Sequence, residues 1–490
     1  MKFKKIISMG LVVALLAGTT GCKSSEPAEN NPSGEKVVIR ILENDTAKKE
    51  GYLDELLKAF NEAYKDKGIE AVDANMEEYT DLAANGPYGY GPDVLYQAND
   101  KLMTYAEDKH VLPITPEEMD CYEYVPEVAW DALKVVVDGQ AYVCGVPVNI
   151  QEPMLFYRED MMPEDWETNW DDNKNAKPDF FENWNDLYAY SSFLRETDTS
   201  ANRDSQYGFM ASLNNLYLAS PFMLSFGSYI FGKNEDGTLN SKDIGFGDGD
   251  AKNGLSAMKQ FAGLMYKGCI DDTITYNRYE KVADGTYFCA VSTPDTYSLF
   301  IEKLALNYEE QGMDQAEALA KATSNLKMIE YPALMPANGD LSADSSTISE
   351  DGWVNTIVMG GVNGYAISSY TKHREACVEF VNFATSYEMI KTRMDTLGIA
   401  PTRSDVAKES NGTADLIFDS LASGKIYLMP SIKAVDQIWV PVQTIMADVA
   451  KDAFRASDNQ TEEYVKPNDF QKALDTACKN VYDAIHVLAD

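Results

Sequence analysis

A cluster of polar side chains follows a short apolar segment near residue 95, and it is the first place where this chain could bind a small molecule. Gly91–Asp93 has the composition of a turn, Val94–Tyr96 that of a strand, and the segment after Leu102 that of a helix. Between them, Gln97–Lys101 supplies an amide, a carboxylate and an ammonium group. Open α/β sheets bind ligands where a strand ends and the next helix begins, so this pattern predicts a binding edge.

A second group of oxygen-bearing side chains has the spacing of an EF-hand calcium loop. Positions 1, 3, 5, 9 and 12 of such a loop are occupied by Asp171, Asn173, Asn175, Asp179 and Glu182. However, Ala176 stands where the sharp turn of that loop requires glycine, and Pro178 follows closely. The broken pattern favours an ordinary acidic surface loop, and we assign no metal ligand.

Sequence motifs of nucleophilic or zinc catalysis are absent. The chain has no GxSxG and no HExxH, and its three histidines lie outside the candidate site residues named below. We therefore expect a protein that is not an enzyme and needs no cofactor. A glycosidase needs only two carboxylates without a local motif, so a secreted carbohydrate-active hydrolase remains an alternative.

The first residues have the features of an export signal. Three lysines precede an apolar segment, Ile6–Ala17, which is too short to span a bilayer permanently. Thr19–Cys22 is similar to a lipobox, with Thr19 where leucine is usual, so we expect residues 1–22 to be a lipoprotein signal and Cys22 to be acylated. Ordinary signal cleavage nearby is the alternative. Residues 23–36 are polar and rich in Pro, Ser and Asn, as in a flexible tether.

Composition restricts the remaining possibilities. A net charge of −36 argues against nucleic-acid binding. The mature chain of about 468 residues is too long for one hydrophobic core, so at least two lobes are expected. Besides Cys22 there are six cysteines without CxxC or zinc spacing, and both disulfides and isolated buried thiols remain open: Cys121, Cys144, Cys269, Cys289, Cys377 and Cys478.

Hydrophobic periodicity indicates an α/β protein. Val37–Leu42 reads as a strand, residues 51–65 as an amphipathic helix and Ile69–Val72 as a returning strand. This alternation predicts βαβ units and a parallel sheet. Further on, Val143–Val148 and Met154–Tyr157 read as strands on either side of a polar link.

Several of these stretches together are similar to bacterial extracellular solute-binding proteins, and more narrowly to the maltose/maltodextrin-binding proteins of sugar ABC transporters. The resemblance rests on GPDVLYQANDKLMTYAED, VPVNIQEPMLFYRED, DGTYFCAVSTPDTYS, GGVNGYAISSYTKHREACVEFVNFATS, LGIAPTRSDV and LMPSIKAVDQIW, and it extends from about Val37 to the C-terminus. It implies a two-lobe, hinged periplasmic-binding-protein-like fold of type II with the ligand between the lobes.

The resemblance also implies lobe boundaries. The N-terminal lobe would comprise residues 37–148 and about 334–388, and the C-terminal lobe residues 154–332 and about 401–490. The hinge would comprise residues 149–153 and about 389–400. A charged insert at about 304–350 has no counterpart in the maltose-binding pattern and has no assigned role.

A sugar offers hydroxyl groups to planar polar side chains and an apolar face to aromatic rings. By resemblance, the ligand-binding residues are Asp45, Gln97, Asp100, Lys101, Gln151, Glu152, Asn215, Tyr217, Asp295, Tyr297 and Trp439. Gln97 and Asp295 stand where the family has tryptophans, and Asn215 stands in place of a carboxylate. Fewer aromatic rings and more amides suggest that the glycan is recognised differently, with α-glucan as the leading expectation.

The expected function is that of a lipid-anchored binding protein at the extracellular face of the cell membrane. It would bind an oligosaccharide as a monomer, close on it and deliver it to the transmembrane subunits of an ABC permease. A cell-surface adhesin with a non-functional cleft is, besides the hydrolase, the other alternative.

Overall fold

The computed structural model describes residues 36–490 except 79, 138–139, 198–206, 236–237, 271–277, 410–415, 418–419, 422 and 488–490. The expected signal peptide, the acylated Cys22 and all but the last residue of the tether lie outside the described residues. Among the residues described, no helix combines the length and apolar character needed to cross a bilayer.

A βαβ unit begins the first lobe, as the periodicity predicts. Strand β1 (Val37–Leu42) pairs in parallel with β2 (Ile69–Asp73) and β3 (Val94–Ala98), and helix α2 (Tyr52–Tyr64) connects the first two. Leu53, Leu56 and Phe60 of α2 are buried, because their i, i+3, i+7 spacing places them on one face of the helix.

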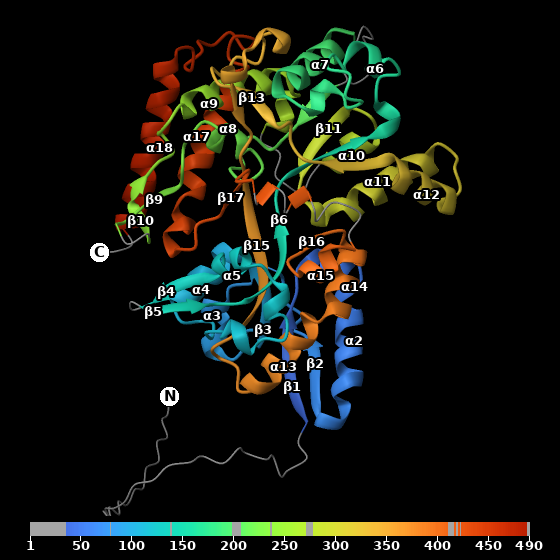
Figure 1. The fold of residues 1–490 in the computed structure, drawn as a ribbon, viewed down its shortest axis with the longest axis vertical. Helices are drawn as coiled ribbons and strands as arrows, with labels where there is room; N and C mark the ends of the chain where they lie inside the picture. The colour runs from blue at the N-terminus through green and yellow to red at the C-terminus, as the bar shows by residue number, and fades with distance from the viewer. Residues whose placement is uncertain are drawn as a thin grey trace, which may run out of the picture. The chain divides into compact units, whose positions relative to one another are not determined.

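The sheet of this lobe is mixed, which corrects the expectation of a parallel sheet. Its strand order is β16-β6-β15-β3-β1-β2, with β17 paired to β15. The central strand β15 (Val358–Ile367) runs antiparallel to β3 and to β6 (Val146–Gln151). The reason is connectivity: β6 leaves this sheet for the second lobe, and the chain re-enters it through β15 from the same end (Figure 1).

The second lobe has its own sheet of four strands, in the order β12-β7-β11-β8. These strands are β12 (Leu326–Ile329), β7 (Met154–Arg158), β11 (Tyr287–Ser292) and β8 (Tyr207–Met210). Trp184, at the start of α7 (Trp184–Thr197), is fully buried against the rings of Phe209, Phe222, Phe261 and Tyr331. Helices α9 (Ala251–Leu264), α17 (Trp439–Asp452) and α18 (Pro467–Val487) pack on one another in this lobe (Figure 1).

The chain crosses between the sheets through a two-residue link, Glu152-Pro153, which separates β6 from β7. The expected single strand 143–148 is wrong: β5 ends at Val143 and β6 begins at Val146. The interruption includes Gly145, where a Cβ would lie 3.0 Å from the carbonyl oxygen of Tyr365, so the close approach of β15 favours glycine.

Two other expected boundaries fall on regular structure. Residues 389–400, the second expected hinge segment, lie mostly in α14 (Tyr387–Leu397), which packs against α2 of the first lobe. Within the range expected for the C-terminal lobe, β17 (Ile426–Leu428) pairs with β15. The lobe boundaries themselves stay a prediction.

The range expected as an insert, 304–350, contains the end of α11 (Tyr297–Glu310), α12 (Gln315–Asn325), strands β12 and β13 (Leu334–Pro336) and a polar loop, so it includes a strand of the second sheet. The other described helices are α1 (Asp45–Lys49), α3 (Leu82–Asn85), α4 (Asn99–Glu107), α5 (Glu127–Asp131), α6 (Trp166–Asn169), α8 (Pro221–Leu224), α10 (Arg278–Ala283), α13 (Arg374–Ala384) and α15 (Ser404–Ala407). The other strands are β4 (Lys134–Val137), β5 (Gln140–Val143), β9 (Phe231–Lys233), β10 (Leu239–Ile244), β14 (Trp353–Asn355) and β16 (Ala400–Pro401).

Candidate functional site

The carboxyl end of β3 carries the polar cluster that the sequence indicates. Gln97 is buried, and its side-chain amide donates to the carbonyl oxygen of Glu78. Asp100 lies in the first turn of α4, where burial raises the pKa of its carboxyl group, and the nearby Asp436 adds to this. The ammonium group of Lys101 lies 5.3 Å from the ring centroid of Tyr105.

Asp45 begins α1, directly after the carboxyl end of β1, and its side chain is exposed. Its backbone N–H donates to the Glu78 carboxylate at 3.1 Å, and its own carboxylate lies 3.5 Å from the ammonium group of Lys48. Glu78 therefore contacts both Asp45 and Gln97. Sequence reasoning missed Glu78, which lies in a loop without a strand or helix to mark it.

Tyr217 is the residue around which the candidates assemble. Its hydroxyl group donates to the carbonyl oxygen of Gln151 at 3.1 Å, at the end of β6. Burial raises the pKa of Tyr217 well above its usual value, and the carboxylates of Glu152, Asp295 and Asp100 raise it further. Three predicted carboxylates from separate parts of the chain thus lie within electrostatic range of one predicted tyrosine.

Asp295 presents an unused hydrogen-bond acceptor. It lies in a 3₁₀ turn (Pro294–Thr296) directly after β11, and its buried Oδ1 has no hydrogen-bond partner among the described residues. Burial raises the pKa of this carboxyl group. Buried polar atoms are nearly always paired, so an unpaired carboxyl oxygen at the end of a strand is a natural acceptor for a ligand hydroxyl.

The remaining candidates lie less centrally. Asn215 shares the turn of Tyr217, and its side-chain oxygen accepts from the backbone N–H of Leu218 at 3.0 Å. The ring of Tyr297 lies 6.4 Å from that of Phe156 and is partly buried against the core. Trp439, half-buried at the start of α17, is joined to the Tyr217 group by no hydrogen bond or ring contact within the described part of the chain.

Asp436 is a further residue that sequence reasoning missed. It lies three residues before Trp439, and its carboxylate accepts a hydrogen bond from the hydroxyl group of Thr104 in α4 at 2.9 Å. It also acts electrostatically on Asp100. The sequence signal that could have identified Asp436 is its position inside the LMPSIKAVDQIW stretch.

A buried ion pair lies in the first lobe, below the ends of β1 and β3. Arg393 of α14 contacts the Glu43 carboxylate with both terminal nitrogens, at 2.7 and 3.2 Å, and both side chains are at most 1% exposed. The guanidinium group lies 4.8 Å from the Tyr52 ring centroid and 4.0 Å from that of Tyr96. Glu43 follows the first strand directly, but its partner is 350 positions away in the sequence, so no local pattern could identify the pair.

The acidic loop at 171–182 uses its oxygens internally. The Asp171 carboxylate accepts from the backbone N–H groups of Asn175 and Ala176, and the Glu182 carboxylate accepts from the side-chain amides of Asn173 and Asn175 at 2.6 Å each. Ala176 has a φ of 63°, a conformation that favours glycine. No cluster of three or more potential metal-ligating side chains occurs in the described ranges.

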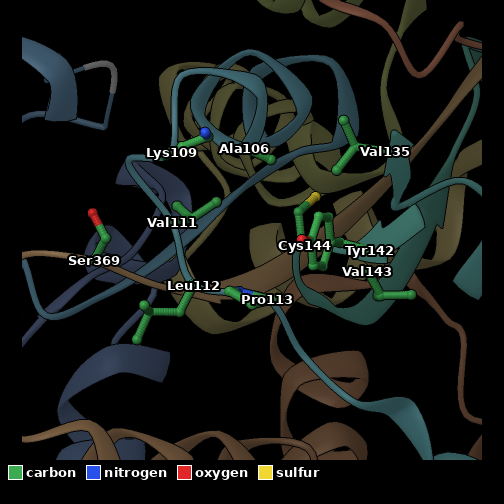
Figure 2. Close-up of a pocket in the computed structure, with 10 residues that line it drawn as sticks. All are labelled: Ala106, Lys109, Val111, Leu112, Pro113, Val135, Tyr142, Val143, Cys144 and Ser369. Atoms are coloured by element: carbon green, nitrogen blue, oxygen red, sulfur yellow. The ribbon is translucent and has the colours of Figure 1, made fainter. Parts of the chain in front are cut away.

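A separate pocket of about 370 Å³ lies beside the β4–β5 hairpin (Figure 2). Its walls include Val111, Leu112, Val135, Val143 and Cys144, with Lys109 at its exposed edge. It contains none of the predicted ligand residues and no carboxylate or amide side chain. Its apolar walls therefore do not have the chemistry that a sugar requires.

Five cysteines have free thiol groups: Cys121, Cys144, Cys289, Cys377 and Cys478. The first four are buried. The interpretation as isolated buried thiols is correct for the first four; Cys478 has a free thiol but is partly exposed, and the side chain of Cys269 lies outside the described residues.

Comparison with known proteins gives consistent matches. A family model described as bacterial extracellular solute-binding protein matches residues 55–418. The galactooligosaccharide-binding protein of Bacillus subtilis (strain 168) is 24% identical over 89% of this chain and 90% of its own length. The maltodextrin-binding protein MdxE of the same organism is 23% identical, over 93% and 95% respectively.

Solved structures show the same fold. MalX of Streptococcus pneumoniae in complex with maltopentaose has a TM-score of 0.64 at 17% identity, covering 91% of this chain and all of that one. The maltose-binding protein MalE of Listeria monocytogenes, in complex with maltose, has a TM-score of 0.63 at 18% identity, covering 92% and 98%. The two-lobe fold is therefore shared with these proteins.

Proposed function

Because the chain belongs to the family of bacterial extracellular solute-binding proteins, whose relatives named above are binding proteins and not enzymes, we propose that it is the substrate-binding component of a carbohydrate ABC importer. The observation that carries this proposal is the group of Asp100, Glu152 and Asp295 around Tyr217, at the ends of strands from both sheets. The unpaired Oδ1 of Asp295 supports an interaction with a hydroxyl-rich ligand.

The ligand is an oligosaccharide, and a maltodextrin is our first choice. One relative is named for galactooligosaccharides and another for maltodextrins, so the panel of test sugars must include both linkage types. A cleft that closes on its ligand typically gives micromolar affinity, which corresponds to about −8 kcal/mol.

The remaining parts of the proposal concern the cell. The chain is tethered outside the membrane through acylated Cys22 and residues 23–36, and acts as a monomer with permease transmembrane subunits. The proposed lobe boundaries are those expected from the sequence, except that α14 is assigned to the first lobe and β17 to its sheet. Mass spectrometry of the protein from the membrane fraction tests the acylation directly. A mature N-terminus at a residue other than Cys22, without an acyl group, would contradict it.

The binding test is isothermal titration calorimetry of the protein without its signal and tether, against maltotriose, longer maltodextrins and galacto-, xylo- and manno-oligosaccharides. Micromolar binding of one class is expected. Asp295→Asn should weaken it by about 1.5 to 3 kcal/mol through the lost charged acceptor, and Trp439→Ala by roughly 2 kcal/mol through lost ring contact.

Tyr266→Ala is the matched control, because this exposed aromatic residue lies outside the predicted ligand-binding set. No heat of binding across the panel would refute the sugar assignment and favour the adhesin. Release of monosaccharides during prolonged incubation would instead favour the hydrolase. Binding that both substitutions leave unchanged would keep the function and refute the site.

A further inference from the structure

A small cavity lies beside the crossover between the two sheets. Its volume is about 30 Å³, enough for about one water molecule. One wall is the two-residue link Glu152-Pro153, and the others include Glu330 and Tyr331 after β12, Val358 at the start of β15, and Ser420 and Lys425 before β17. The cavity therefore lies among segments that belong to both sheets.

The Glu152 carboxyl group is inadequately paired in this cavity. Its side chain is 2% exposed, and its Oε1 has no hydrogen-bond partner within the described part of the chain. The second carboxyl group in the cavity, that of Glu330, accepts a hydrogen bond from the hydroxyl group of Ser420. A buried carboxylate without a hydrogen-bond partner is energetically unfavourable, and protonation of the carboxyl group removes the buried charge.

The charges around Glu152 lead to the same conclusion. The titratable groups that interact with it are Glu330, Lys425, Tyr217 and Tyr331. If both carboxyl groups are ionised, one lysine faces two negative charges, whereas one proton makes the cavity neutral. Burial first, and the charge of Glu330 second, raise the pKa of Glu152 to about 8, while Lys425 acts in the opposite direction.

We propose that the crossover cavity is a proton-binding site, in which Glu152, beside Glu330, holds one exchangeable proton that couples lobe closure, and hence ligand affinity, to pH. The coupling arises at the link: Gln151, adjacent to Glu152, accepts the hydrogen bond of Tyr217, and any rotation between the sheets must turn the backbone at Glu152-Pro153. Closure that withdraws Glu152 further from water strengthens its hold on the proton, so ligand binding takes up a proton at pH values where the ligand-free protein has lost it. The effect on affinity rests on the proposed sugar-binding function, whereas the proton site itself does not.

The first experiment needs no ligand. Infrared difference spectra across pH 5–9 should show one protonated carboxylic acid that ionises near pH 8, and this band should be absent in Glu152→Gln. Glu330→Gln removes the neighbouring charge and should shift the ionisation to lower pH. Glu310→Gln, at the exposed end of α11, should leave the band unchanged. Absence of the band in the wild-type protein, or its persistence in Glu152→Gln, would overturn the proposal.

The second experiment measures coupling by calorimetric titration with the bound sugar in buffers of different ionisation enthalpy. Binding above pH 8 should take up close to one proton, and the affinity should fall roughly tenfold per pH unit there. In Glu330→Gln this fall should begin at lower pH. A pH-independent affinity alongside a titrating infrared band would refute the coupling. If no sugar binds at any pH, the proposed function fails, and the infrared spectra still decide the proton site.

Discussion

Replacing Arg393 by methionine tests the physical account of the first lobe most directly. The substitution keeps most of the side-chain volume but leaves the Glu43 carboxylate buried, with its Oε1 and Oε2 deprived of guanidinium contacts at 2.7 and 3.2 Å. It also removes a cation between the rings of Tyr52 and Tyr96. Breaking a buried pair on one side typically costs about 3 to 5 kcal/mol.

The Glu43 carboxylate would keep hydrogen bonds from the hydroxyl group of Tyr365 and the backbone N–H of Asn44. These neutral donors offset only part of the lost charge pairing, so we expect the free energy of unfolding to fall by about 4 kcal/mol at pH 7.

Urea unfolding at pH 7, followed by circular dichroism, measures this loss. Lys391→Met, two residues away on α14 and paired with the exposed Asp395 and Glu409, is the matched control and should change stability by at most about 0.5 kcal/mol. A loss for Arg393→Met that is below about 1 kcal/mol would refute the reasoning.

Three further predictions concern packing and reactivity. Gly254→Ala should lower the melting temperature markedly, because the new Cβ would lie 1.9 Å from the carbonyl oxygen of Phe222. Gly263→Ala in the same helix meets only ordinary contact and should raise stability by about 0.5 to 1 kcal/mol, so equal effects of the two substitutions in calorimetric scans would contradict the packing of α9. Tyr217→Phe should lose about 1 kcal/mol in urea unfolding through its missing hydrogen bond, and an unchanged midpoint would count against that contact. Burial raises the pKa of the Cys377 thiol to about 12, so this thiol should react with a disulfide reagent only after the protein unfolds. Rapid labelling of Cys377 in the native protein, located by peptide mass mapping, would contradict its burial.

Local signals predicted the elements well. The spacing of Leu53, Leu56 and Phe60 identified α2, and the GPD turn with its apolar run identified β3, because these patterns depend on neighbours in the sequence. The direction of β15 could not be predicted in this way, since it depends on which end of the sheet the chain re-enters after the second lobe.

The candidate site was predictable only in part. The family resemblance supplied Asp100, Glu152, Tyr217 and Asp295, which the structure brings within electrostatic range of one another. It did not supply Glu78 or Asp436, whose roles depend on contacts with residues distant in the sequence. Neither periodicity nor motif spacing reports such long-range contacts.

The placement of β15 has a consequence for how the protein reaches its folded state. This wholly buried strand fills the centre of the first sheet, between β3 and β6, yet it lies more than 200 residues after β6. The first lobe therefore cannot complete its core until nearly three quarters of the chain has been made. Because this pairing joins segments far apart in the sequence, we expect the first lobe to complete its sheet late in folding.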